Sequence, residues 1–66
     1  MIDPPHTQIL KLSYNKLTRV SPGLFEGLAG LVRLHLDHNL IHFIEPYTFS
    51  GLASLKLLLL EGNNSF

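Results

Sequence analysis

The stretch LKLSYNKL (residues 10–17) decides the fold, because the same pattern recurs at a fixed distance along the chain. LHLDHNLI occupies residues 34–41 and LLLEGNNS occupies residues 58–65, so successive copies begin 24 residues apart. The segments between the copies also match, since VSPGLFEGL (residues 20–28) aligns with IEPYTFSGL (residues 44–52). A repeat with this period predicts an array of similar units, each packed against its neighbours.

Each unit begins with a Leu-x-Leu alternation, the period-two pattern of a strand with one buried face. We expect the leucines to point into a shared interior and the residues between them to point outward. The interior leucines predicted in this way are Leu10, Leu12, Leu34, Leu36, Leu58 and Leu60. Because a single unit cannot bury this face alone, the units should stack as coils, with their strands parallel and about 4.8 Å apart.

An asparagine follows each predicted strand, at Asn15, Asn39 and Asn63. The chain has to turn sharply at this point, which leaves backbone groups pointing inward. A carboxamide supplies two donors and an acceptor, enough to pair with its own turn and with the neighbouring coil. A leucine there would leave backbone groups unpaired at about 1–3 kcal/mol each, and an aspartate would bury a charge. We therefore predict a structural ladder of asparagines through the coils.

The segment that returns from one strand to the next carries a phenylalanine and a proline in both complete units. Phe25 and Phe49 are predicted to form a second internal stack. Pro22 and Pro46 each fix φ and remove a backbone donor, which prevents a continuous helix. We expect irregular, turn-rich connections on this side.

The pattern L-x-x-L-x-L-x-x-N-x-L over residues 7–66 resembles the extracellular leucine-rich repeat family, in its 24-residue class. The resemblance implies an α/β-type solenoid with a short parallel β-sheet on the concave side and a turn-rich, irregular convex side. Within that family, SYNKL (residues 13–17), RLHLDHN (residues 33–39) and LEGN (residues 60–63) are most similar to adlican-like matrix proteins, which combine leucine-rich repeats with immunoglobulin domains. The resemblance to the extracellular leucine-rich repeat family also implies secretion, an extracellular location and binding of a protein ligand.

The repeat boundaries divide the chain into residues 7–30, 31–54 and a truncated 55–66, preceded by residues 1–6 as the remnant of an N-terminal flank. Terminal coils of a solenoid expose their interiors, and natural arrays therefore carry caps. Since neither end of this sequence resembles such a cap, we interpret it as a fragment or a truncated product, a short standalone chain being the alternative. Uncapped ends also leave self-association open. We expect no signal peptide within this sequence, because residues 1–5 contain no basic segment and no apolar stretch follows them.

Composition excludes several functional classes. Five basic residues balance five acidic ones, which argues against a nucleic-acid binder. The longest apolar run, at residues 57–60, is far shorter than a membrane span. The chain has no cysteine, which removes thiol catalysis, cysteine-ligated zinc and a disulfide framework. The glycines lie at repeat turns rather than in a phosphate-binding loop, and we expect no cofactor.

The outward positions of the three strands form the candidate binding surface. Aligned by the repeat, they make three rows: Ile9, Arg33 and Leu57; Lys11, His35 and Leu59; and Ser13, Asp37 and Glu61. Rows that mix arginine with exposed aliphatic side chains are typical of protein-recognition surfaces, although the same positions are also ordinary solvated strand residues. The partner-binding residues predicted on this concave face are Lys11, Arg33, His35, Asp37, Leu57, Leu59 and Glu61.

Leu57 and Leu59 place two outward leucines on the last strand. Such a pair is unfavourable unless something covers it. One interpretation is that the two leucines are an apolar anchor for a ligand. The other is that a following coil or a flanking region covers them. Without cover, residues 57–60 are an aggregation hazard.

Three groups of polar residues could suggest a metal site, a catalytic triad or pH-dependent binding. His35, His38 and His42 are close in sequence but fall mid-strand, in the turn and beyond the asparagine, so we expect no metal site. Ser13, His35 and Asp37 share one face, but an open surface without an oxyanion hole does not make a triad. His35 beside Asp37 leaves a weaker hypothesis of pH-tuned binding.

Asn63-Asn64-Ser65 fits the N-glycosylation pattern. Its acceptor is the predicted ladder asparagine, so folding and glycosylation compete there, and we expect no modification.

The sequence therefore favours a non-enzymatic protein-binding module from an extracellular or matrix protein. Three alternatives stay open: a structural spacer, a truncated product without a ligand, and an intracellular leucine-rich adaptor.

Overall fold

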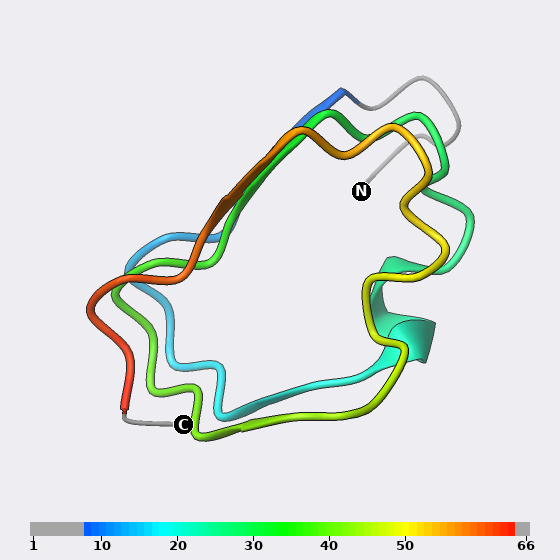
Figure 1. Ribbon diagram of the computed structural model, residues 1–66. Coiled ribbons are helices and arrows are strands. Elements are labelled where there is room, and N and C mark those ends of the chain that lie inside the picture. Colours follow the sequence, from blue (N-terminus) through cyan, green and yellow to red (C-terminus); the bar gives the residue numbers. More distant parts are fainter. Residues whose placement is uncertain (1–7, 65–66) are drawn as a thin grey trace.

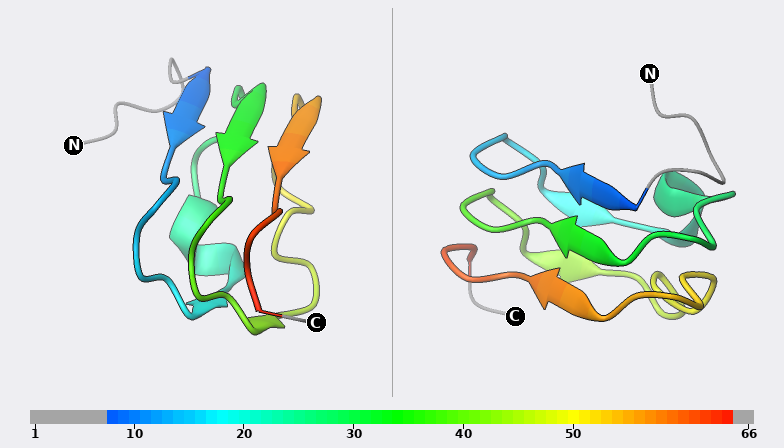
Figure 2. Two further views of the ribbon diagram at one scale, coloured as in Figure 1. Left: turned by 90° about the vertical axis from the view of Figure 1, so that its left-hand side faces the viewer. Right: turned by 90° about the horizontal axis from the view of Figure 1, so that it is seen from above.

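The computed structural model describes residues 8–64. In chain order, its elements are β1 (Ile9–Lys11), β2 (Arg19–Val20), the 3₁₀-helix η1 (Pro22–Phe25), β3 (Arg33–His35), β4 (Phe43–Ile44) and β5 (Leu57–Leu59). Viewed along the stack, the backbone forms superimposed loops (Figure 1), and the turned views show them as successive coils lying side by side (Figure 2). The predicted flank at residues 1–6, and Ser65 and Phe66 of the third repeat, lie outside the described residues.

The leading edge of each coil contributes one strand to a three-stranded parallel sheet of order β1-β3-β5. Leu10 pairs with Leu34, and Leu34 pairs with Leu58. The register is therefore the repeat itself, since partners are 24 residues apart. The sequence expectation of stacked coils with parallel strands is confirmed. A slip of one residue would turn every leucine of a strand to the other face, so the Leu-x-Leu alternation fixes this register.

The returning side holds a second, two-stranded parallel sheet that the sequence reading did not predict. Its strands β2 and β4 pair Arg19 with Phe43 and Val20 with Ile44. The guanidinium carbon of Arg19 also lies 4.8 Å from the centroid of the Phe43 ring, a cation–π contact across the two coils. A β-branched residue at the same repeat position in both units was the available signal.

Beyond these strands, the returning side consists of turns and one short helix. Residues Pro22–Phe25 form η1, with the proline at its start, where a missing N–H costs nothing. The corresponding stretch of the second coil, residues 46–51, is a run of turns. Within residues 8–64 there is no α-helix, so the turn-rich expectation describes this side better than the α/β label does.

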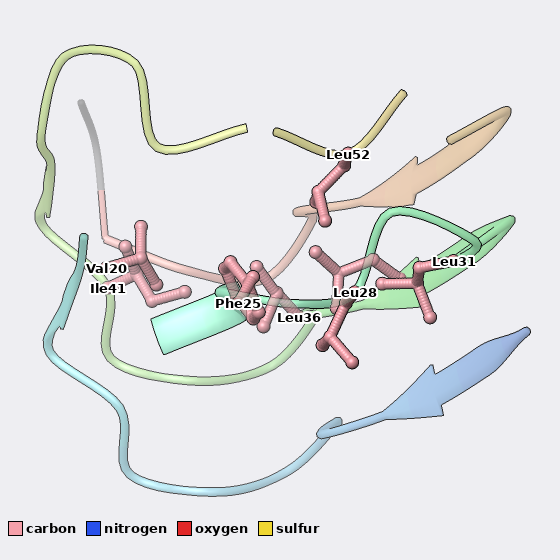
Figure 3. Packing of buried hydrophobic residues seen from close by; sticks show 8 residues of the cluster. Val20, Phe25, Leu28, Leu31, Leu36, Ile41 and Leu52 are labelled. Atoms are coloured by element: carbon pink, nitrogen blue, oxygen red, sulfur yellow. The ribbon is translucent and has the colours of Figure 1, made fainter. Parts of the chain in front are cut away.

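The core lies between the sheet and the returning side, and the middle coil supplies most of it (Figure 3). Leu31, Leu34, Leu36 and Ile41 are all 0% exposed. The corresponding leucines of the outer coils, Leu10, Leu12, Leu58 and Leu60, are partly buried and pack against this cluster. The difference follows from stacking, because only the middle coil has a described neighbour on each side.

The predicted phenylalanine stack is present. The ring centroids of Phe25 and Phe49 lie 6.0 Å apart with an interplanar angle of 24°. Phe25 is 3% exposed and Phe49 is half-buried. Such offset aromatic pairs add about 0.5–1.5 kcal/mol to the burial of the rings themselves.

Candidate functional site

The candidate site is the outward face of the sheet β1-β3-β5 and its continuation into the following turn; we call it the strand face. Pairing of the strands sets its first two rows, Ile9–Arg33–Leu57 and Lys11–His35–Leu59. Pairing continues beyond the strands, since the backbone N–H of Tyr14 donates to Asp37 O and that of His38 donates to Glu61 O. The third row, Ser13–Asp37–Glu61, is therefore aligned in the same way. The three parallel strands that carry these rows are seen together in Figure 2.

Exposed aliphatic side chains lie at both ends of the first row. Ile9 is 47% exposed and Leu57 is 39% exposed, with Arg33 between them. Leu59, the second outward leucine of β5, is half-buried. The strand face therefore carries aliphatic side chains on both outer strands, one on β1 and two on β5, and Arg33 on the strand between them.

The charges of the strand face are separated along the strand direction. Lys11 and Arg33 are exposed in the first two rows, whereas Asp37 and Glu61 occupy the third. Arg33 and Asp37 are four residues apart on one extended segment, a separation of roughly 13 Å at the usual rise per residue. A partner crossing the face would meet a basic part and then an acidic part.

Ser13 and Asp37 are joined directly across the first two coils. The hydroxyl of Ser13 donates to Oδ1 of Asp37 at 2.6 Å. This hydrogen bond holds the pKa of the Asp37 carboxyl below its usual value, with smaller contributions from the backbone of Asp37 and from His38 and His35, against partial desolvation. Since the proton of Ser13 is directed to a carboxylate and not to an imidazole, the arrangement lacks the hydroxyl–imidazole bond of a catalytic triad.

The turn after each strand contains a column of residues that sequence reasoning missed as a group: Tyr14, His38 and Gly62. The rings of Tyr14 and His38 are stacked, with centroids 4.5 Å apart and an interplanar angle of 7°. Nε2 of His38 lies 3.8 Å from Oδ2 of Asp37 and 3.9 Å from Oε2 of Glu61. The signal that could have found this column is the repeat itself, because its members are 24 residues apart.

The side chains of His35 and His42 do not form a cluster with that of His38. His35 is half-buried in β3, and the exposed His42 has its Nδ1 3.4 Å from the carbonyl of Leu40. Over residues 8–64, the structure contains no group of three or more histidine, aspartate or glutamate side chains arranged to hold a metal ion. The same residues form no pocket, and none of their helices is long and apolar enough to cross a membrane.

The asparagines differ in how many coils they join. Oδ1 of Asn39 accepts from the backbone N–H of Leu17, and its Nδ2 donates to the carbonyls of Leu12 and Leu36. Asn39 is 3% exposed. The exposed Asn15 donates to Leu12 O and to a second carbonyl of its own turn, but not to another coil among the described residues.

Asn63 repeats the geometry of Asn39 one coil further along. Its Nδ2 donates to Leu36 O at 2.9 Å and to Leu60 O at 2.8 Å. Its Oδ1 accepts from the backbone N–H of Ile41 at 3.0 Å. Both amide hydrogens and the amide oxygen of Asn63 are therefore used within and between the coils.

Comparison with known proteins connects this geometry to a family. The family profile described as "Leucine rich repeat" matches residues 5–64. Lumican of Gallus gallus and lumican of Coturnix japonica are each 53% identical to this chain over 30 residues, which is 46% of the chain. That match covers 9% of the length of either lumican.

Members of repeat families of this kind generally act as protein-interaction modules, because stacked units present an extended surface. The family match spans most of the sequence, and the paired strands follow its period. This chain belongs to the leucine-rich repeat family.

Proposed function

We propose that the chain is a non-enzymatic protein-binding module of an extracellular or matrix leucine-rich repeat protein, and that it binds through the strand face, the concave side of the solenoid. The observation that carries the proposal is the first row. There, Arg33 lies between Ile9 and Leu57, which keep 47% and 39% of their surface exposed.

Arginine is enriched at protein interfaces, and the centre of an interface is more apolar than the rest of the surface, so a row that combines both fits a contact surface. The second and third rows add Lys11, His35, Leu59, Asp37 and Glu61 to the proposed contact surface. Opposite charges placed in different rows favour one orientation of the partner over the reverse.

The extracellular part of the proposal rests on the resemblance to the 24-residue repeat class and agrees with the similarity to the two lumicans. From the narrower resemblance to adlican-like matrix proteins we propose only that the full-length protein combines leucine-rich repeats with immunoglobulin domains. No cofactor, nucleic acid or metal takes part in the proposed function.

The test uses the immobilised full chain and a detergent-free extracellular matrix extract, with retained proteins quantified by mass spectrometry. The double variant Arg33→Ala, Leu57→Ala removes the centre of the first row. The matched control, Arg19→Ala with Leu40→Ala, removes the same two residue types from exposed positions outside the strand face. A partner that binds the strand face is lost from the first variant by about tenfold or more and kept by the control.

The alternative is a structural spacer, or a truncated product with no ligand of its own. In that case, the wild-type chain retains nothing that the double variant fails to retain. Concentration-dependent sedimentation of the purified chain separates a third outcome, in which copies associate with one another.

A further inference from the structure

We propose that Asn63 is a conditional N-glycosylation acceptor. It is modified only while the third coil is open, which here means that the hydrogen bonds between Asn63 and the second coil are broken. A glycan on Asn63 then prevents the coil from closing, because these bonds cannot form again. The sequence Asn63-Asn64-Ser65 supplies the acceptor pattern. Acceptors of this kind normally lie in surface loops with a free side-chain amide. In this chain the acceptor is a ladder asparagine.

The amide of Asn63 has no free hydrogen in the closed coil. Nδ2 donates to Leu60 O in its own turn and to Leu36 O in the second coil. Leu36 is 0% exposed, so the second of these bonds points toward a position from which solvent is excluded. Glycosyl transfer to Nδ2 therefore requires that at least one of the two bonds first be broken.

The chemistry of transfer makes the exclusion mutual. A bond forms between Nδ2 and C1 of the first sugar of a lipid-linked oligosaccharide, and the bond between C1 and the oxygen of the lipid diphosphate breaks. The lipid diphosphate leaves with the bonding electrons, and Nδ2 loses one proton to a base of the transferase. The product amide keeps one hydrogen, so it can no longer satisfy both Leu36 O and Leu60 O.

Size adds to the loss of the hydrogen bond. The second and third coils pair at the ordinary strand spacing of about 4.8 Å, which leaves no room for a sugar ring between the half-buried Asn63 amide and Leu36 O. Oδ1 of Asn63 also accepts from the Ile41 N–H, and Ile41 is 0% exposed. An oligosaccharide at Nδ2 displaces this side chain from the interior, and the Ile41 N–H loses its acceptor.

The third repeat differs from the other two at one position of this motif. Leu17 and Ile41 follow Asn15 and Asn39 by two residues, and both pack into or against the core. Ser65 is the equivalent residue of the third repeat and lies outside the described residues, but its identity completes the acceptor pattern. Only this repeat therefore combines a ladder asparagine with the sequence of an acceptor.

The consequence for a cell rests on the proposed extracellular route, because the transferase works in the secretory pathway. Closure of the third coil has to precede transfer if the strand face is to include β5. The structural exclusion itself involves no partner, so its test is independent of whether the chain binds a protein.

The experiment is cell-free glycosylation of the purified full chain, with an oligosaccharyltransferase and a lipid-linked oligosaccharide, followed by intact-mass and peptide-mass analysis. Hydrogen exchange at the Ile41 N–H reports whether the third coil is closed, because that group donates to Asn63. The matched control is Lys16→Asn, which places an acceptor sequence over residues 16–18, where Lys16 and Thr18 are exposed. Ser65→Ala in the same background identifies modification of Asn63.

We expect chains with a protected Ile41 N–H to be modified at position 16 at least about tenfold faster than at Asn63, since transfer to Asn63 has to wait for local opening. Leu58→Asp, which disrupts packing of β5, should expose the Ile41 N–H and allow modification of Asn63. If the wild-type chain is itself open, it should be modified at Asn63 and show no protection. A glycan on Asn63 together with a protected Ile41 N–H overturns the proposal. So does an unmodified Asn63 in an open chain that is modified at position 16.

Discussion

The phenol ring of Tyr14 lies flat against the imidazole ring of His38, with centroids 4.5 Å apart and an interplanar angle of 7°. Both residues have left-handed backbones, at φ 58° and φ 56°, and Gly62 continues the series at φ 75°. The same turn is therefore built in each coil, and it aims successive side chains along one column. The column ends at Gly62 because a Cβ there would lie 2.4 Å from Nδ1 of His38.

Gly62→Ala should destabilise the chain by about 1–3 kcal/mol, since it combines a left-handed φ with a clash against a ring. The His38 ring has to leave its stack with Tyr14 to accommodate the methyl group. Thermal unfolding followed by circular dichroism measures the loss of stability.

Gly51→Ala is the matched control, because a Cβ at Gly51 meets nothing within 4 Å and no left-handed φ is involved. The double variant His38→Gly, Gly62→Ala should recover part of the loss, since the clashing ring is gone. Equal melting temperatures for Gly62→Ala and Gly51→Ala would contradict the role assigned to Gly62.

Tyr47 is a left-handed residue without a stacking partner among the described residues. Its φ is 63° and its side chain is 81% exposed. Asparagine tolerates this conformation better than tyrosine does, because its short side chain bonds locally. We expect Tyr47→Asn to raise the free energy of unfolding by about 0.5–1 kcal/mol, measured by urea denaturation. Tyr14→Asn, which removes the stack with His38, should give no such gain.

The asparagine ladder predicts unequal costs at equivalent positions. Asn39→Ala leaves the Leu17 N–H without its acceptor, whereas the Leu12 and Leu36 carbonyls keep Asn15 and Asn63 as donors, so we expect a cost of about 2–3 kcal/mol. Asn15→Ala removes bonds within one exposed turn and should cost about 1 kcal/mol or less. Chemical denaturation of the two variants measures the difference. Equal losses would show that the contacts of Asn39 with the neighbouring coil contribute little.

Much of this fold could be predicted because the repeat acts at every level of structure. The spacing of Leu10, Leu34 and Leu58 determines both the period of the coils and the register of the sheet. The alternation around Leu34 determines which residues face outward. The rows of the strand face follow from these two facts without knowledge of any side-chain contact.

The sequence did not predict features that depend on backbone conformations and strand pairings, because the residues of the repeat pattern do not specify them. The sheet formed by β2 and β4 contains only two residues per strand, so it leaves almost no periodic signal. The left-handed φ of His38 is unexpected for a residue other than glycine. Its place between Tyr14, Asp37 and Glu61 follows from that φ, and the sequence alone offered only a group of three histidines.

The bond from Ser13 to Asp37 predicts a specific acid dependence of stability. It holds the pKa of Asp37 in the folded chain below the usual carboxyl value, which is about 3.9 in the unfolded chain. A depressed folded pKa gives stability that is present above the unfolded pKa and is lost as the pH falls through the folded pKa.

Ser13→Ala removes the largest cause of the lowered Asp37 pKa and should therefore lower the melting temperature at about pH 6. The difference from the wild type should shrink as the pH falls from there through the lowered pKa of Asp37, because the folded wild-type chain then protonates this carboxyl as well. Thermal melts across that range, with an NMR titration of the Asp37 carboxyl, measure the effect. A difference that stays constant with pH would mean that the hydroxyl contributes only packing.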